Sequence, residues 1–232
     1  MAMSYVVFLI LAVVCAALAA ALVWYDRNHT PNVHSERAAW ATSREFVYRP
    51  SDESLRDEFH RGGMVMPGDP PVVDVAHGTY FGANAYVFDL AESATIAAVH
   101  RGSASGALMD LRPENAHPPV EAGMEPLGAL GTRILYTNNA DVARRVADRR
   151  MITFAEQVPA HIESLWNEGP WTLGQMPLTD DPDDLDEALE AVRRFGDLLR
   201  VLPPEGHARV VTSGGPRDPG QPVPVRGKEA RR

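Results

Sequence analysis

The residue types that most often carry chemistry are scattered through this 232-residue chain. No Gly-rich phosphate loop and no HExxH, GxSxG or DxDxDG pattern occurs in it. Five of the eight histidines fall on separate predicted elements without the spacing of metal ligands: His60, His77, His100, His117 and His161. His77 and His100 lie in neighbouring predicted strands and are the pair expected to approach, although ordinary strand histidines explain them better than a metal pair.

Serine and acidic clusters also lack the partners that catalysis or calcium binding needs. Ser103 and Ser105 lie in a predicted turn with no nearby base to activate them. The acidic run 180–190 fails the calcium-loop pattern, because Pro182 and Leu185 occupy ligand positions and no turn glycine follows. Capping of a following helix explains that run better. We therefore predict no catalytic, cofactor-binding or metal site, and a non-enzymatic protein.

Composition excludes some classes of partner. The chain has 31 acidic and 22 basic residues, a net charge of −9, which argues against nucleic acid as the main partner. Its one cysteine, Cys15, lies in an apolar stretch, so the rest of the chain has neither a disulfide nor a thiolate metal site. The near absence of lysine and the abundance of alanine indicate a GC-rich genome, and thus an actinobacterium.

The first half of the chain predicts helices followed by an antiparallel sheet. An apolar helical pattern begins at Ser35 and leads to a short strand over 46–48, and a second helix begins over 50–52 and carries Leu55 and Phe59 on one face. Alternating segments 72–80 and 85–90 predict a hairpin. Segments 95–100 and 106–112 complete a four-stranded meander. Residues 113–131 predict a loop, and 132–137 a further short strand.

The second half predicts helices that cover the sheet. Two short helices are expected over 141–147 and 152–158, and a hairpin over 161–176 is expected to close the sheet. A last helix begins at the predicted N-cap Asp181, with Pro182 at its first position. Its apolar stripe comprises Leu185, Leu189, Val192, Phe195, Leu199 and Leu202. Residues 35–202 are therefore predicted to form one α+β domain, a mainly antiparallel sheet with helices packed on one face.

A stretch of twenty residues before this domain predicts a membrane anchor. Residues 5–24 contain no charge and no proline, and as a helix they would span roughly 30 Å, the thickness of a bilayer's hydrocarbon core. Residues 1–4 form a short N-terminal tail and 25–34 a polar stalk. Arg27, Arg37, Arg44 and Arg49 follow the stretch and no basic residue precedes it, so the positive-inside rule places the domain in the cytoplasm, against the inner membrane.

Two alternative functions remain open: a secreted or periplasm-facing binding module, and a divergent enzyme whose site is assembled only by the fold. If the apolar stretch is a signal segment instead, the protein is a secreted or periplasm-facing binding module.

Residues 203–232 contain six prolines and almost no large apolar side chain, and they predict a disordered Pro/Gly-rich tail with a basic end.

Short motifs in this layout resemble a known family. They are Trp40-Ala41 followed by Phe46-Val47-Tyr48 and Asp52, then Val87-Phe88-Asp89, Leu111-Arg112-Pro113-Glu114, and Val146-Ala147-Asp148-Arg149-Arg150 ahead of Phe154-Ala155. Over roughly residues 5–202 the chain is similar to the trehalose monomycolate transport factors of mycobacteria and corynebacteria. The resemblance implies one N-terminal span, a cytoplasmic domain, and an adaptor role with the RND-type transporter that exports trehalose monomycolate across the inner membrane. It brings no catalytic residues.

Overall fold

The computed structural model describes residues 36–204. The predicted tail, membrane span and stalk, residues 1–34, and nearly all of the predicted C-terminal tail lie outside the described residues. Between residues 36 and 204, no helix is both long enough and apolar enough to cross a membrane.

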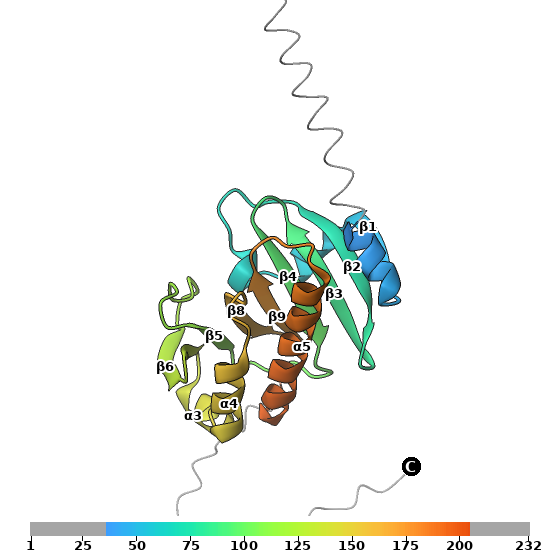
Figure 1. The fold of residues 1–232 in the computed structure, drawn as a ribbon. Coiled ribbons are helices and arrows are strands. Elements are labelled where there is room, and N and C mark those ends of the chain that lie inside the picture. The colour runs from blue at the N-terminus through green and yellow to red at the C-terminus, as the bar shows by residue number, and fades with distance from the viewer. Residues whose placement is uncertain (1–35, 205–232) are drawn as a thin grey trace, which may run out of the picture.

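One antiparallel sheet of nine strands forms the centre of the domain (Figure 1). Its strands are β1 (Val47–Ser51), β2 (Val72–Tyr80), β3 (Ala83–Leu90), β4 (Ala94–His100), β5 (Met109–Pro113), β6 (Glu125–Leu130), β7 (Arg133–Thr137), β8 (Ser164–Glu168) and β9 (Trp171–Met176). Their order in the sheet is β1-β2-β3-β4-β9-β8-β5-β7-β6, and every neighbouring pair is antiparallel. The predicted α+β class with a mainly antiparallel sheet is confirmed.

The predicted four-stranded meander is right for three strands and wrong for the fourth. β2, β3 and β4 follow one another in the sheet, but β4 then pairs with β9 and β5 pairs with β8. The β8–β9 hairpin therefore lies in the middle of the sheet and does not close its edge as predicted. Alternation in a sequence indicates which face a side chain occupies and leaves the neighbouring strand undetermined.

One strand lies in the segment that predicts a loop. β6 pairs with β7 at the edge of the sheet, with a register shift between Pro126 and Gly128. Most of its residues are exposed, so the strand lacks the apolar alternation that marks a half-buried strand. Proline is also confined to edges and bulges within sheets, which fits its position here.

Helices cover both faces of the sheet, which corrects the prediction of helices on one face. They are a first helix over residues 36–43, α2 (Ser54–Glu58), α3 (Ala140–Val146), α4 (Arg149–Gln157) and α5 (Pro182–Leu198), with the short 3-10 turns η1 (Gly62–Met64) and η2 (Leu199–Val201). The first helix, α3, α4 and α5 share one core with Val87 and Val99. On the other face, Leu55 of α2 and Met64 of η1 pack with Ile96. Both faces of the sheet need helices packed on them, because β4 carries apolar side chains on its two faces.

The long helix α5 lies across β4 and β9, as its apolar stripe predicts (Figure 1). Asp181 caps it by accepting a hydrogen bond from the Asp183 amide, and all six predicted stripe residues are buried. Close approach depends on Gly174 of β9. A Cβ at Gly174 would lie 2.8 Å from a methyl of Val192 and 2.9 Å from a methyl of Leu165.

Candidate functional site

The histidine pair expected to approach is separated by a whole strand. β3 lies between β2, which carries His77, and β4, which carries His100. His77 packs edge-on against Tyr86 at 5.7 Å between ring centroids, and His100 packs edge-on against Trp171 at 4.9 Å. The expected approach is wrong because β3 separates the two strands in the sheet, as it does in the sequence. Within residues 36–204, no three His, Cys, Asp or Glu side chains are grouped to hold a metal ion.

Ser105 has a structural partner. Its hydroxyl donates a hydrogen bond of 2.8 Å to the carbonyl of Pro203 and accepts one from the Ala107 amide. It thereby ties the β4–β5 connection to the chain that follows α5. Ser103 lies exposed in the same connection.

The acidic run at the start of α5 does more than cap that helix. Asp186 accepts hydrogen bonds from the indole nitrogen of Trp40 at 3.1 Å and from Arg44 at 3.0 Å. Asp180 lies 3.4 Å from a guanidinium nitrogen of Arg37. These contacts join the first helix to α5, two elements about 140 residues apart in the sequence. The run therefore holds the segment that follows the predicted anchor against the domain.

Arg37 is the centre of this junction and is completely buried. It donates hydrogen bonds of 3.0 Å to Asp89 Oδ1, 2.8 Å to the carbonyl of Thr179 and 3.3 Å to the carbonyl of Asp74. Asp74 has a left-handed backbone, φ 51°, at the bulge in β2. The prediction used Arg37 only as a flanking charge that orients the membrane span, whereas the structure buries its side chain inside the domain. Its position on the same helix face as Ala41 is the one sequence signal of that burial.

Burial changes the titration of the groups around Arg37. Burial raises the pKa of Asp89, although the neighbouring Arg37 lowers it in part, and it raises the pKa of Asp180 in the same way. Burial also raises the pKa of Tyr48, and the hydrogen bond of 2.6 Å from Tyr48 to Asp74 raises it further. Removal of these carboxylates from water therefore costs free energy, and the Arg37 guanidinium offsets that cost in part.

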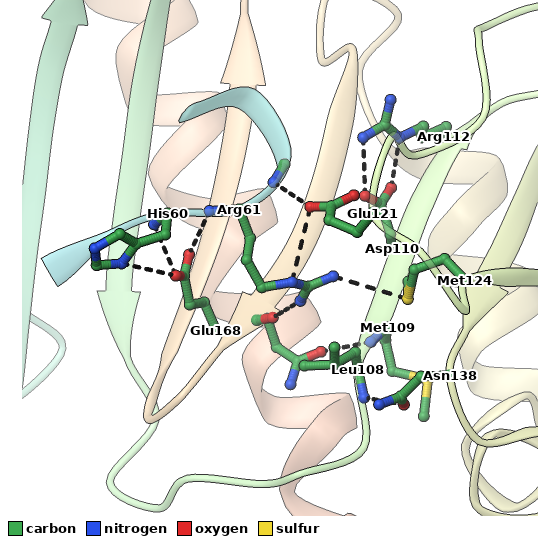
Figure 2. A network of polar contacts seen from close by, with 12 residues as sticks. His60, Arg61, Leu108, Met109, Asp110, Arg112, Glu121, Met124, Asn138 and Glu168 are labelled. Carbon is green, nitrogen blue, oxygen red and sulfur yellow. Dashed lines mark hydrogen bonds and ion pairs between the residues drawn. The ribbon is translucent and has the colours of Figure 1, made fainter. Parts of the chain in front are cut away.

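A second polar network lies at the opposite face of the sheet (Figure 2). Glu168 accepts hydrogen bonds from the backbone amides of His60 and Arg61, at 2.7 and 3.2 Å. Glu121, from the loop between β5 and β6, accepts one of 2.8 Å from the Gly62 amide and lies 3.8 Å from Arg61 Nε. Arg61 also donates to the carbonyl of Asn167 at 2.7 Å. The network thus fixes η1 and the β5–β6 loop over β8.

Beside this network, Asp110 and Arg112 of β5 form a pair with two hydrogen bonds, of 2.7 and 3.0 Å (Figure 2). Burial raises the pKa of the Asp110 carboxyl against the effect of Arg112. Arg112 also donates to the carbonyl of His117 at 3.2 Å, in the β5–β6 loop. Every charged group drawn in this region has a protein partner, and the network joins elements within the domain.

An open groove lies between α4 and α5. A pocket of about 570 Å³ is lined by Arg149, Arg150, Thr153, Phe154, Arg194, Asp197 and Leu198. A second pocket of about 420 Å³ shares Phe154 and Arg194 and continues along Tyr80, Gln157, Val158, Pro159, Asp186, Glu187, Glu190 and Ala191. We call the two together the α4–α5 groove. The prediction had assigned Arg149 and Arg150 only to a link between helices, because nothing in the sequence places them beside α5.

Arg194 forms the centre of the α4–α5 groove. Its guanidinium lies 5.5 Å from the ring centroid of Phe154 and donates a hydrogen bond of 2.9 Å to Gln157. The Phe154 ring in turn stacks on Phe195, at 6.0 Å. The arginine is therefore positioned by an aromatic and an amide, and its charge has no carboxylate partner within 4.0 Å among residues 36–204.

Comparison with known proteins gives the same family by sequence and by structure. A family model described as trehalose monomycolate transport factor TtfA matches residues 3–231. Trehalose monomycolate transport factor A of Mycolicibacterium smegmatis is 40% identical over 194 residues, which are 84% of this chain and 70% of that protein.

The fold is also similar to a crystal structure of the mycobacterial trehalose monomycolate transport factor A, with a TM-score of 0.72 and 42% sequence identity. The match covers 74% of this chain and 97% of the crystallised one. Sequence and fold agree over most of the chain, and the predicted family resemblance is confirmed. The chain belongs to the trehalose monomycolate transport factor TtfA family.

Proposed function

We propose that this chain is a non-enzymatic, membrane-anchored adaptor in the transport of trehalose monomycolate, and that its partner is an RND-type lipid transporter. The observation that carries the proposal is 40% identity, over 84% of the chain, to a protein named for that transport. The described domain supports binding over catalysis as its mode of action. Its buried carboxylates, Asp89 and Asp110, are paired with Arg37 and Arg112 and hold elements together.

The anchor and its orientation are part of the same proposal. Residues 5–24 form a single membrane span, and the domain lies on the cytoplasmic side of the inner membrane. Confinement to the membrane raises the effective concentration of the domain near a membrane partner, so a weak contact persists. A secreted or periplasm-facing binding module is the alternative. Reporters fused at Asp26 and Arg232 separate the two, because a cytoplasmic domain gives activity only with a cytoplasmic reporter.

Complementation tests the transport role. In a Mycolicibacterium smegmatis strain depleted of its own transport factor, we expect the full chain to restore the labelling of trehalose dimycolate from newly made trehalose monomycolate. Crosslinking in the membranes of the same cells, followed by purification, should recover an RND-type transporter. Accumulation of unprocessed trehalose monomycolate despite stable expression would contradict the transport role, and recovery of no transporter would contradict the adaptor role.

A further inference from the structure

At its Leu198 end the α4–α5 groove carries two cations without ion-pair partners, whereas Asp186, Glu187 and Glu190 line its other end. Arg149 and Arg194 both line the Leu198 end, and neither has a carboxylate within 4.0 Å among residues 36–204. Three other arginines at this end of the molecule are paired: Arg144 with Asp141 at 2.9 Å, Arg150 with Asp148 at 2.8 Å, and Arg200 with Asp197 at 2.9 Å. Arg145 of α3, which lies outside the groove, has no carboxylate within 4.0 Å among the described residues either. Unpaired cations in a shared groove are notable in a chain of net charge −9, since acidic residues are in excess.

The position of Arg149 adds to this potential. Arg149 is the first residue of α4, where the helix dipole is positive and a cation is unfavourable. Asp148, the N-cap, accepts hydrogen bonds from the amides of Arg150 and Met151 and pairs with the Arg150 side chain. Its carboxylate is therefore already engaged, and the exposed Arg149 guanidinium is available to a partner.

The groove also has apolar surface. Phe154 and Leu198 line it between the arginines, and Thr153 lies exposed at its rim. From Asp186 to Leu198 the two pockets follow thirteen residues of α5, a length of roughly 18 Å at the helical rise. Asp186, Glu187 and Glu190 line the half that lies farther from Leu198. The half between Arg149 and Arg194 therefore suits the carboxylates of a short peptide segment.

The location of the groove favours a protein segment over a lipid surface. The first helix, which follows the predicted anchor, contacts the start of α5 through Trp40 and Asp186. Arg149 faces the end of α5, near Asp197 and Leu198, about 17 Å farther along the helix. In Figure 1 the first helix and α4 accordingly lie at opposite ends of the domain. The arginine end of the groove is thus the end that faces away from the first helix, the described element nearest to the predicted anchor.

We propose that the Leu198 end of the α4–α5 groove binds a short acidic segment of a partner protein, with Arg149 and Arg194 holding its carboxylates and the partly exposed Leu198 contacting an apolar side chain. The inference rests on the proposed adaptor function and names the chemistry of the partner's contact. Arginine can hold a carboxylate with two parallel hydrogen bonds. Because Arg194 already stacks on Phe154, its side chain loses less conformational entropy on binding. Charge complementarity of this kind sets the orientation and speed of association.

Site-specific photocrosslinking in cells tests the groove. The full chain carries p-benzoylphenylalanine at Thr153, and for comparison at Thr42, which is exposed on the first helix at the other end of the domain. After illumination of Mycolicibacterium smegmatis membranes, we expect Thr153 to capture a partner peptide rich in Asp and Glu, and Thr42 not to capture it. An adduct with lipid only, an adduct with a second copy of this chain only, or no adduct from Thr153 would each overturn the proposal.

Charge reversal gives the matched control. Arg149→Glu and Arg194→Glu should each reduce the Thr153 adduct about tenfold, because one held carboxylate then meets a like charge. Arg144→Glu makes the same change in net charge on α3, outside the groove, and should leave the adduct within about twofold. Arg149→Glu suits the helix dipole and is expected to keep the fold, which circular dichroism checks. Equal loss in the Arg144 variant, or no loss in the groove variants, would overturn the proposal.

The transport assay separates this inference from the proposed function. If the chain restores transport and Thr153 captures no acidic segment, the groove assignment is wrong and the transport role stands. If Thr153 captures an acidic segment and the chain fails to restore transport, the groove assignment stands and the transport role is wrong.

Discussion

Arg37 is the residue on which the junction between the first helix and the rest of the domain depends. It is the only cation within 4.0 Å of the Asp89 carboxylate among the described residues, and it also donates to two backbone carbonyls. Thr95 completes the site by donating a hydrogen bond of 2.8 Å to Asp89 and accepting one from the Thr179 amide. A single side chain therefore joins the first helix, β2, β3 and the start of α5.

Arg37→Met is expected to lower the free energy of unfolding by about 3–5 kcal/mol, because removal of one partner leaves a buried carboxylate without its cation. Urea unfolding of the full chain in detergent, followed by tryptophan fluorescence, measures the change. Arg49→Met is the control, since Arg49 forms only an exposed pair with Asp52 and should change stability by about 0.5 kcal/mol or less. Equal effects of the two variants would contradict this role of Arg37.

Asp89 gives a pH dependence of definite sign. Because burial raises its pKa above the ordinary value of 3.8, the folded protein binds this proton more tightly than the unfolded chain does. The contribution to stability is therefore complete below pH 3.8 and is lost as pH rises through the raised pKa. We expect the stability of the wild type relative to Asp89→Asn to fall as the pH rises above 3.8 in urea unfolding series.

Asp52 provides the comparison of opposite sign. Hydrogen bonds from Ser54 lower the pKa of Asp52, so its contribution is present above 3.8 and lost on acidification. The stability of the wild type relative to Asp52→Asn should therefore rise with pH. Parallel pH profiles for the two variants would rule out this account of Asp89.

At the scale of elements, the sequence predicts those parts whose signals are local. The β2–β3 hairpin, the β8–β9 hairpin and α5 were all predicted, because alternation, turn residues and the cap at Asp181 lie within a few residues of one another. The position of β8–β9 between β4 and β5 was not, since it depends on contacts between distant segments. β6 was missed because an exposed edge strand with Pro126 and Gly128 has no apolar pattern.

Polar sites, like helices and strands, can be predicted from the sequence only where their signals are local. The role of Asp181 is readable from Pro182 and the acidic residues beside it. The burial of Arg37 has only the position of Ala41 on the same helix face as a signal, and an arginine on an amphipathic helix normally indicates the solvent face. The α4–α5 groove is equally invisible in the sequence. Arg149 and Arg194 meet only because α4 and α5 pack side by side, 45 residues apart.

The packing of α5 on the sheet depends on the missing side chain at Gly174. Gly174→Val is expected to cost about 1–3 kcal/mol, because its Cβ would lie under 3.0 Å from methyl groups of Val192 and Leu165. Thermal unfolding by circular dichroism measures it. Ala129→Val, on the exposed edge strand β6, is the control and should leave the melting temperature nearly unchanged. A Gly174 variant as stable as this control would contradict the close packing.

In the whole molecule, most of the arginines used to predict the orientation of the membrane span have partners or burial inside the folded domain. Three of the four arginines that follow the predicted span belong to the folded domain: Arg37 is buried, Arg44 pairs with Asp186, and Arg49 pairs with Asp52. Arg27 lies outside the described residues. The cytoplasmic orientation therefore remains a proposal, and the reporter fusions described above are its direct test.

If confinement to the membrane is what the N-terminal stretch supplies, its sequence is replaceable. Deletion of residues 1–24 should abolish complementation of the depleted Mycolicibacterium smegmatis strain while the domain remains folded. An unrelated single span of the same orientation should restore most of it. Restoration by the deleted chain alone, at matched expression, would show that tethering is dispensable, and failure of the unrelated span would point to specific contacts made by residues 5–24.

The central place of the β8–β9 hairpin has a consequence for synthesis of the chain. β1 to β4 and β5 to β7 are synthesised before residues 164–176, so until the hairpin is made each group has an unpaired strand edge. Only arrival of the hairpin joins β4 to β5 and gives α5 a continuous surface. A ribosome that stalls between residues 140 and 163 would thus release a nascent chain with two open β-edges, the kind of species that chaperones bind and that aggregates when they are absent.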